Sequence, residues 1–512
     1  MESAAPGRTN VVLVLADDLG FSDLHCYGGE ISTPHIDSLA ASGRRSSAFY
    51  NTARCSPSRA SMLTGRHPHE TGVAVLTDDQ RPWGYPGTLS TSVPTIAEHL
   101  KGAGYSTALI GKWHLSAGTA APDESWPTRR GFDEFYGILG GADDYFHPRG
   151  LWENETRCPV PGEGYYLTTE IGERAADFVA KASAQDEPFF LFAAFTAPHW
   201  PLHAPAETVE RYREVYARGW DAARLERLGR LVDEGLVPYG AELGGDDQLQ
   251  PWDSAPDRDW QIERMAVYAA QVELLDAAVG RILGALREAG AEDDTLILVL
   301  SDNGASAEEL PPHDAPRFRE RHPTTTVDGE PMLLGNEPEI VPGPPNSFAS
   351  YGEDWATLSN TPFRRYKRWV HEGGIATPLI VSWPGGPVEA GSIGHEPGQL
   401  TDILPTVLEV AGVPGDPSLT GVSLVSGPAG GPRPLFWEHM GNAAVRLGQW
   451  KAVRDFDRPW ELYNLTVDRG ERYDLAAVFP GLADELAGRW DAWADEVGVI
   501  PWAQVAAARR AG

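Results

Sequence analysis

The chain has 512 residues and a formal net charge of −31 at pH 7, with 42% hydrophobic and 22% charged residues. A chain of this length can bury a large core without disulfides, and it is expected to form two or three domains, or one large α/β domain with an appendage. Its acidity excludes a nucleic-acid partner, which requires a basic surface, and argues against binding to anionic membranes.

The first apolar run of the chain is not expected to be a signal peptide. Residues 11–16 are a short apolar run that lacks a preceding basic segment and ends at two aspartates, so they predict a buried strand and not a signal peptide. No stretch of the sequence approaches the ~20 apolar residues of a membrane helix. We therefore expect a cytoplasmic protein with no membrane partner. The spacing of Cys26, Cys55 and Cys158 fits neither a disulfide framework nor a zinc site, so Cys26 and Cys158 are expected to be free thiols.

Five short apolar runs bounded by turn residues are typical of the buried strands of a parallel sheet: residues 11–16, 106–110, 189–195, 295–300 and 377–382. Helical patterns lie between them. The clearest covers residues 264–289, where apolar side chains recur at steps of four and three and form one helix face; shorter candidates cover 94–101 and 402–410. This alternation predicts a doubly wound α/β sheet with helices on both faces.

Two stretches rich in proline and glycine interrupt this pattern. Residues 305–361 are long and charged, and such loops inside a compact domain are often functional, so we expect this one beside the active site. Residues 412–434 are expected to link a catalytic domain, 1–425, to a smaller C-terminal domain, 426–512. Within the latter, four short strands of an antiparallel sheet are predicted at residues 435–439, 443–447, 450–454 and 461–464.

Acidic and amide side chains follow two of the predicted strands. Asp17 and Asp18 come directly after the first strand, and Asp302 and Asn303 follow the fourth. Open α/β sheets place their ligands at the carboxyl ends of strands. Three carboxylates and one amide are hard oxygen donors that suit Ca²⁺ or Mg²⁺ and not zinc. Each pair alone is most simply interpreted as a turn, but the two together predict a metal site.

The stretch around Cys55 has an unusual composition. Residues 55–59 read Cys-Ser-Pro-Ser-Arg, and residues 64–66 read Thr-Gly-Arg. A lone cysteine is usually an inert core residue, but Pro57 is typical of a helix start, and Arg59 would share a helix face with Cys55. Free N–H groups at a helix N-terminus favour an anion. We therefore expect an oxyanion pocket with residue 55 at its mouth.

Three further segments carry basic side chains. Residues 111–114 read Gly-Lys-Trp-His after the second strand, and Lys112 and His114 would point the same way in an extended chain. His199 lies in a Pro-His-Trp-Pro segment after the third strand. Lys367 ends an Arg-Arg-Tyr-Lys run, for which a solvated basic surface is the default interpretation. In isolation, each would be interpreted as a structural or surface feature.

The Cys-x-Pro-x-Arg, Thr-Gly-Arg and Gly-Lys-Trp-His motifs resemble those of the type I sulfatases, and of bacterial arylsulfatases in particular. The similarity extends over nearly the whole chain, from Asn10 to residues 438–442. It implies an alkaline-phosphatase-like fold, with a large mixed sheet flanked by helices and a smaller C-terminal domain with a short antiparallel sheet. It also implies a sulfuric ester hydrolase that converts an aryl or carbohydrate sulfate to an alcohol and inorganic sulfate.

The resemblance also assigns the site residues. Cys55 is expected to be oxidised to formylglycine by a formylglycine-generating enzyme. Calcium, or else magnesium, is expected to be bound by Asp17, Asp18, Cys55, Asp302 and Asn303. In the implied mechanism the two lysines bind the sulfate, one histidine contacts the formylglycine and the other protonates the leaving group. The implied catalytic set is Cys55, Arg59, Lys112, His114, His199 and Lys367.

Two other functions remain open from the sequence: a phosphate or phosphonate ester hydrolase on a similar scaffold, and a catalytically silent binding protein. The intact motifs favour a sulfatase. Pocket walls are expected from residues 140–150 and 305–361, with Asp144, Tyr145, His147 and Trp200 among the candidates. Their rings suit either an aryl group or a sugar, and the sequence does not choose between aryl, alkyl and carbohydrate sulfates.

Overall fold

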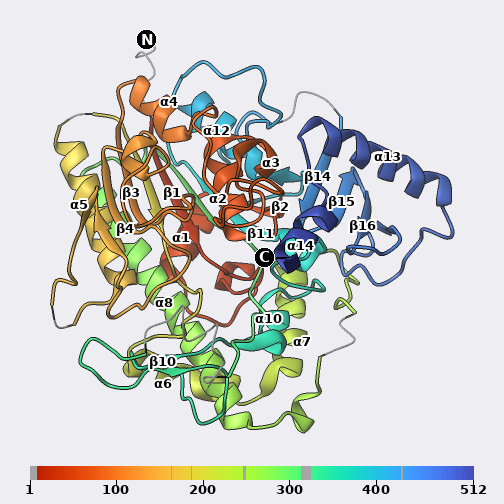
Figure 1. Cartoon of the computed structure of the whole chain (residues 1–512), viewed down its shortest axis with the longest axis horizontal. Helices are drawn as coiled ribbons and strands as arrows, with labels where there is room; N and C mark the ends of the chain where they lie inside the picture. The colour runs from red at the N-terminus through yellow and green to blue at the C-terminus, as the bar shows by residue number, and fades with distance from the viewer. Residues whose placement is uncertain are drawn as a thin grey trace.

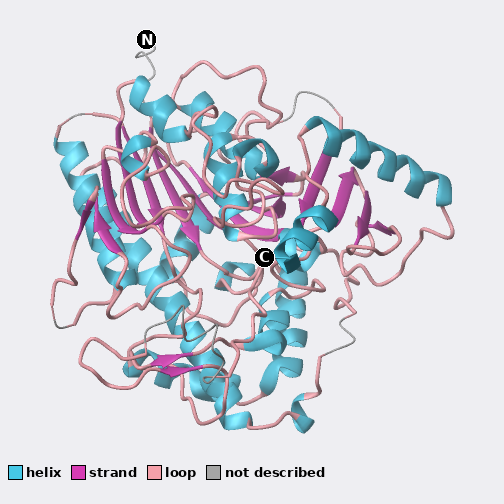
Figure 2. Cartoon of the chain, in the orientation of Figure 1, coloured by secondary structure: helices cyan, strands magenta, loops and turns pink. Residues whose placement is uncertain are grey.

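A large mixed β-sheet forms the centre of the protein, seen here in a computed structural model that describes residues 9–162, 164–185, 187–245, 249–312, 324–427 and 431–511. Figures 1 and 2 show this sheet with helices on both faces and a smaller sheet beside it. Within the described ranges the large sheet has 11 strands. They lie in the order β12 (Ser392–Gly394), β2 (Arg44–Tyr50), β11 (Ala376–Ser382), β8 (Thr295–Ser301), β1 (Asn10–Ala16), β7 (Phe189–Ala194), β3 (Ser106–Lys112), β4 (Glu134–Ile138), β5 (Leu151–Glu153) and β6 (Thr156–Arg157), and β13 (Gly398–Gln399) also pairs with β2.

The five predicted strands are all present, and four of them form the parallel core of the sheet. β1 lies between β7 and β8, with Val11 paired to Phe190 and Leu296, and β3 follows on the far side of β7. Because parallel strands end at the same edge, the segments that follow these four strands come together there. The fifth strand, β11, is antiparallel to both β8 and β2, so the expectation of a parallel strand is wrong for it. An apolar run indicates that a strand is buried on both faces of the sheet, but it does not indicate the direction of the strand.

The side chains of β1 alternate between two hydrophobic cores, as the pleat of a strand requires. Val12 and Val14 face a core shared with α1 (Pro34–Ser42), α5 (Leu167–Ala184) and α8 (Arg258–Glu288). Val11 and Leu13 face a second core shared with α2 (Cys55–Thr64), α4 (Ile96–Gly102) and α12 (Ile403–Val410). Three of these helices, α8, α4 and α12, confirm the helical patterns predicted from the sequence.

Among the described residues, no helix is both long and apolar enough to cross a membrane. Cys26, Cys55 and Cys158 form no disulfide, as expected for Cys26 and Cys158. The remaining elements of the main body are short or peripheral. They are α3 (Pro68–Thr71), α6 (Ala206–Tyr216), α7 (Gly219–Asp233), β9 (Leu333–Leu334), β10 (Ser347–Phe348), α10 (Gly352–Ser359) and α11 (Glu372–Ile375).

The C-terminal part forms a second, antiparallel sheet with α13 (Pro480–Glu496) packed on it and α14 (Trp502–Ala511) at the end of the chain (Figure 1). On one face, Trp490 and Trp493 of α13 pack with Val445; on the other, Trp437 and Val453 belong to the main core. The four predicted strands are confirmed, whereas α13 was not predicted. The domain boundary between residues 425 and 426 stays a prediction. The strands are β14 (Pro434–His439), β15 (Asn442–Leu447), β16 (Trp450–Arg454) and β17 (Glu461–Asn464).

A buried cluster of charges joins the C-terminal sheet to the main body. The ammonium of Lys451 lies 3.0 Å from a carboxylate oxygen of Glu372 and 2.8 Å from one of Glu471, and all three side chains are fully buried. Arg469 and Tyr50 both donate to the second oxygen of Glu372, each at 2.9 Å. Although burial opposes ionisation, Lys451 and then Arg469 lower the pKa of Glu372 below its ordinary value. The cluster therefore holds α11 against the C-terminal sheet.

Replacing Lys451 by methionine is expected to destabilise the protein by about 3–5 kcal/mol, because two buried carboxylates lose the cation they share. The shift of the urea unfolding midpoint, followed by tryptophan fluorescence, measures the loss. Lys101→Met is the control, because Lys101 pairs with Asp133 at 2.6 Å but is 49% exposed. A surface pair of this kind contributes about 0–1 kcal/mol. Equal losses of stability in the two variants would show that the buried cluster stabilises the protein no more than a surface ion pair does.

Candidate active site

The predicted metal ligands come together at the carboxyl edge of the parallel strands. Asp17 and Asp18 directly follow β1, and Asp302 and Asn303 follow its neighbour β8. The backbone N–H of Asp18 donates to a carboxylate oxygen of Asp302 at 3.3 Å, and the side-chain amide of Asn303 donates to Asp18 at 2.6 Å. A positive φ of 67° at Asp18 turns the chain sharply after the strand. All four side chains are buried, so hard oxygen donors converge away from solvent.

Cys55 is the first residue of α2, and Arg54 caps the helix. The helix begins two residues earlier than its proline suggests, which makes Pro57 the third helical residue, where its missing N–H still costs no hydrogen bond. The Cys55 thiol lies 3.4 Å from Nδ1 of His114. The residue is only 2% exposed, so the expectation that it lies at the mouth of a pocket is wrong. It lies below the surface because the whole of α2 is packed inside the protein.

Arg59 lies one turn after Cys55 on α2 and connects this helix to the carboxylates. Its Nε donates to Asp302 at 3.0 Å, and a terminal nitrogen donates to the backbone carbonyl of Lys112 at 2.7 Å. Another terminal nitrogen lies 2.9 Å from Asp302 and 3.8 Å from Asp17. The guanidinium is fully buried, and these contacts hold α2, the carboxylates that follow β1 and β8, and the end of β3 in one arrangement.

Lys112 and His114 both reach the site, but not by the route that the sequence suggested. β3 continues to Lys112, whose ammonium pairs with Asp17. His114 has a positive φ of 57°, so the chain is not extended there and the two side chains diverge to different partners. A Cβ on Gly141 would lie 2.7 Å from the His114 ring, so only glycine permits this close packing. The turn directs the imidazole to Cys55 and the ammonium to the carboxylates.

His199 and Lys367 complete the predicted set. Nε2 of His199 lies 3.4 Å from Asp18, and its Nδ1 donates to the carbonyl of Trp200 at 2.6 Å. The ammonium of Lys367 lies 2.8 Å from Asp18. Lys367 is buried and Arg368 beside it is exposed, so the default interpretation of a solvated basic run is wrong for the lysine. Sequence composition did not distinguish these two neighbours, because only the fold decides which side chain points inward.

The donor set fits a divalent cation. In the described part of the chain, one oxygen of Asp17 and the amide oxygen of Asn303 are buried and accept no hydrogen bond. Ligand atoms of Asp17, Asp18 and His199 lie within 4.8 Å of one another, which adds a histidine to the predicted neighbourhood. Burial, and then the charge of Asp17, raise the pKa of Asp302 to about 7. A cation would satisfy the two oxygens and offset this repulsion.

The site is also suited to an anion. Burial lowers the pKa of both His114 and His199, which favours their neutral forms. The positive charges of Lys112, Lys367 and Arg59 balance the three carboxylates. A bound divalent cation would therefore give the site a net positive charge within a strongly acidic protein, which matches an anionic ester.

Lys367 of this centre also lines a cavity of about 510 Å³, which identifies residues that the sequence reasoning missed. Arg54 and Glu308 form an ion pair of 2.8 Å in its wall. In the sequence, only their positions could have pointed to a role in the site. Arg54 precedes Cys55, and Glu308 lies in the long loop expected beside the site. The other lining residues are Val75, Leu76, Ala307, Glu309, Tyr366, Lys367, Arg368, Trp369, His439 and Met440.

Several predicted wall residues have a supporting position instead. The hydroxyl of Tyr145 donates to the carbonyls of Thr196 and His199, and Asp144 pairs with His203 at 3.5 Å. The backbone N–H of His147 donates to Asp144, so this loop folds on itself. These side chains brace the segment that carries His199, and they do not line the cavity.

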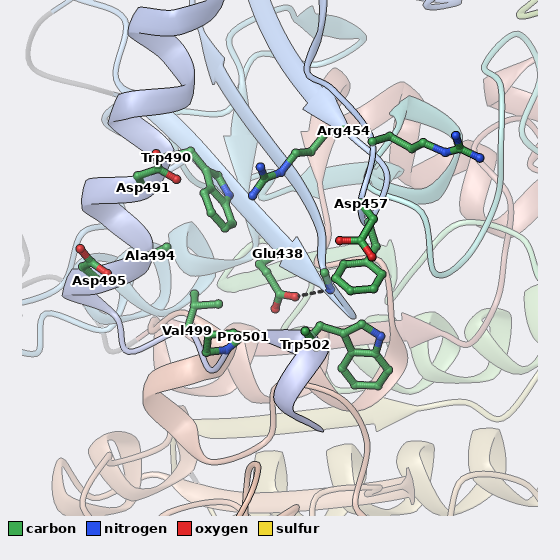
Figure 3. A pocket seen from close by; sticks show the side chains of 14 residues that line it. Glu438, Arg454, Asp457, Trp490, Asp491, Ala494, Asp495, Val499, Pro501 and Trp502 are labelled. Atoms are coloured by element: carbon green, nitrogen blue, oxygen red, sulfur yellow. Dashed lines mark hydrogen bonds between the residues drawn. The ribbon is translucent and has the colours of Figure 1, made fainter. Parts of the chain in front are cut away.

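A second cavity, of about 500 Å³, lies between the C-terminal sheet, α13 and α14 (Figure 3). It is lined by Trp490, Trp502 and several charged side chains, and by none of the predicted site residues. In Figure 3, Glu438 accepts a hydrogen bond from the backbone N–H of Gly441, at 2.6 Å. This cavity is separate from the candidate active site.

Taken together, the fold and the site have the features of a hydrolase of anionic esters. Hard oxygen donors that suit a divalent cation lie at the carboxyl edge of a mixed sheet, and the opposing lysines and arginine suit the charged end of a substrate.

Comparisons with known proteins specify the class. The family model described as Sulfatase matches residues 9–413. The chain is 33% identical to an uncharacterised sulfatase of Schizosaccharomyces pombe, over 98% of this chain and 96% of that protein. It is 31% identical to an arylsulfatase of Klebsiella aerogenes, over 81% of this chain and 89% of that protein. This chain belongs to the sulfatase family and is a sulfuric ester hydrolase.

Solved structures support the same fold. The crystal structure of Ps i-CgsB in complex with k-i-k-neocarrahexaose matches with a TM-score of 0.68 and 25% identity, over 95% of this chain and 92% of that chain. The structure of BT4656 in complex with its substrate, D-glucosamine-2-N,6-O-disulfate, matches with a TM-score of 0.66 and 21% identity, over 96% and 98%. The predicted mixed sheet with a smaller C-terminal antiparallel sheet is confirmed.

Proposed function

We propose that this sulfatase works with a formylglycine formed from Cys55 and with a calcium ion bound by Asp17, Asp18, Asp302, Asn303 and residue 55. The observation that carries the proposal is the buried convergence of these four oxygen-bearing side chains, with Arg59 linking them to the helix that begins at Cys55. When bound, the cation supplies charge that polarises oxygen atoms next to it. Formylglycine supplies an oxygen nucleophile through its hydrated aldehyde.

The basic side chains bind and orient the sulfate. Lys112 and Lys367 lie against Asp17 and Asp18, where their ammonium groups can reach the oxygens of a sulfate held at the same place. Arg59 orients Asp302 and keeps the start of α2 next to it. Because the site is buried, water is excluded from these charged groups. This strengthens the attraction of the cations to the sulfuryl oxygens.

The two histidines hold and move protons. Nδ1 of His114 faces the side chain of residue 55 and would remove a proton from it. Because a carbonyl only accepts, the bond to Trp200 places the proton of neutral His199 on Nδ1 and leaves Nε2 facing the site. Asp18, 3.4 Å from Nε2, favours the uptake of a second proton there, and His199 would then pass this proton to the departing alcohol oxygen. General acid and base groups of this kind contribute about 10²–10⁴-fold each.

The substrate proposed for this chain is an aryl or carbohydrate sulfate. The relative from Klebsiella aerogenes is named an arylsulfatase, and BT4656 was solved with a sulfated sugar. We also propose maturation by a formylglycine-generating enzyme. A cytoplasmic location stays a prediction, which fractionation of the native host tests directly.

Mass spectrometry of the peptide that contains Cys55 tests the modification. Conversion of the thiol to an aldehyde is expected to lower the peptide mass by about 18 Da in protein purified from its native host. Peptides with Cys26 and Cys158 serve as internal controls and are expected to keep their masses. A wholly unmodified Cys55 in a preparation that hydrolyses sulfate esters would overturn the proposed nucleophile.

Competing rates test sulfate against phosphate as the transferred group. We expect kcat/KM for p-nitrophenyl sulfate to exceed that for p-nitrophenyl phosphate by at least about tenfold, which corresponds to about 1.4 kcal/mol of transition-state stabilisation. The reason is that the chain carries the sulfatase motifs around Cys55 and Lys112 and belongs to the sulfatase family. Higher activity on the phosphate would instead favour a phosphate ester hydrolase on the same scaffold.

A further inference from the structure

The cavity above the active site has a strongly polar wall. Lys367 lines this cavity and pairs with Asp18, so a sulfate ester bound at Lys367 would extend its alcohol portion into the cavity. This step rests on the proposed function. The wall carries Arg54, Glu308, Glu309 and Arg368, charges of both signs, and its volume of about 510 Å³ is ample for a single sugar ring.

Glu308 is the carboxylate in this wall that is tied to the catalytic segments. One of its oxygens lies 2.8 Å from the guanidinium of Arg54, and the other accepts a hydrogen bond of 2.9 Å from the indole of Trp200. Arg54 precedes Cys55 in the chain and Trp200 follows His199. The second oxygen also lies 4.0 Å from the ammonium of Lys367. Glu308 is therefore held in one position by Arg54 and Trp200, which are the chain neighbours of Cys55 and His199.

The carboxylate keeps acceptor capacity that faces the cavity. Burial opposes its ionisation, but Lys367 and then Arg54 lower the pKa of Glu308 below its ordinary value, so it is negative. An ionised carboxylate offers about four acceptor positions, and Arg54 and Trp200 use one on each oxygen. The side chain remains 32% exposed although its two oxygens are anchored. Hydroxyl groups can reach the remaining positions.

We propose that Glu308 is a specificity-determining residue that accepts hydrogen bonds from hydroxyl groups on the alcohol portion of the substrate. The substrate class that satisfies it is a polyhydroxylated ring, that is, a carbohydrate sulfate. An aryl sulfate without hydroxyl groups offers Glu308 no donor, and a second anionic group close to it is repelled. Hydrogen bonds to a charged partner typically change affinity by about 10- to 100-fold, because an acceptor position that a substrate covers without donating to it loses its contact with water.

The test compares two substrates in the mature enzyme. Initial rates are measured with p-nitrophenyl sulfate and with a panel of glucose and galactose monosulfates, the latter by ion chromatography of released sulfate. The quantity of interest is the ratio of kcat/KM for the best sugar sulfate to kcat/KM for p-nitrophenyl sulfate. In Glu308→Gln and Glu308→Ala this ratio is expected to fall by about 10- to 100-fold. Glu234→Gln is the matched control, because Glu234 pairs with Arg45 at the same 2.8 Å and lies outside the cavity.

The outcomes separate this inference from the proposed function. An enzyme that hydrolyses p-nitrophenyl sulfate but no sugar sulfate in the panel would overturn the role of Glu308. So would a variant that is folded by its thermal unfolding midpoint and lowers both rates equally, since that result marks Glu308 as a structural support for Lys367 and Trp200. Loss of all activity in the wild-type enzyme with intact formylglycine would instead count against the proposed function.

Discussion

Replacing Cys55 by alanine is expected to lower kcat/KM for p-nitrophenyl sulfate by at least about 10⁴-fold, because it removes the side chain that we propose is converted to the nucleophile. The residue is the first of a buried helix, and its thiol faces Nδ1 of His114 at 3.4 Å. Stopped assays with purified protein measure the rate, and the thermal unfolding midpoint checks that the variant is folded.

Cys158→Ala provides the control for this substitution. Cys158 is also a free cysteine, but it lies at the edge of the main core away from the catalytic residues, and its loss is expected to change the rate by less than about twofold. If Cys55→Ala kept more than about one hundredth of the wild-type rate, a different nucleophile would have to be sought among the remaining side chains.

Removal of divalent cations with EDTA is expected to lower the sulfatase rate by at least about 100-fold and to lower the thermal unfolding midpoint. Three buried carboxylates meet in the site, and repulsion from Asp17 contributes to the raised pKa of Asp302, so an ion bound there stabilises the folded state. At a calcium concentration of 100 times the dissociation constant, this linkage contributes about 2.7 kcal/mol. Calorimetric titration with Ca²⁺ measures the binding itself, independently of activity.

Asp302→Asn tests the same site through one ligand. The variant is expected to bind Ca²⁺ at least about tenfold more weakly, because it replaces a charged donor by a neutral one and also breaks the pair with Arg59. Asp79→Asn is the control, since Asp79 pairs with Arg81 at the surface and its loss is expected to leave calcium affinity unchanged. Recovery of the chelated enzyme by Mg²⁺ and not by Ca²⁺ would overturn the choice of calcium, and full activity in EDTA would overturn the metal site.

The sequence alone determined the parts of this protein that depend on local pattern. Apolar runs bounded by turn residues predicted β1, β3, β7 and β8, and the 3.6-residue periodicity predicted α8, because burial imposes these patterns on any chain. The ends of two strands predicted that Asp17, Asp18, Asp302 and Asn303 would meet. The motif around Cys55 identified the family, because its chemistry requires particular residues at fixed spacing.

Only the tertiary structure decided what depends on contacts between distant segments. The direction of β11, the turn at His114, the burial of Lys367 beside the exposed Arg368 and the placement of Cys55 below the surface all arise from packing that no local pattern records. The same holds for the pairing of Glu308 with Arg54 and of Lys451 with Glu372, whose partners are far apart in the chain. The sequence does not show which residue a charged side chain will pair with. The energy of a buried pair depends on distance and desolvation, and both are set only when the chain has folded.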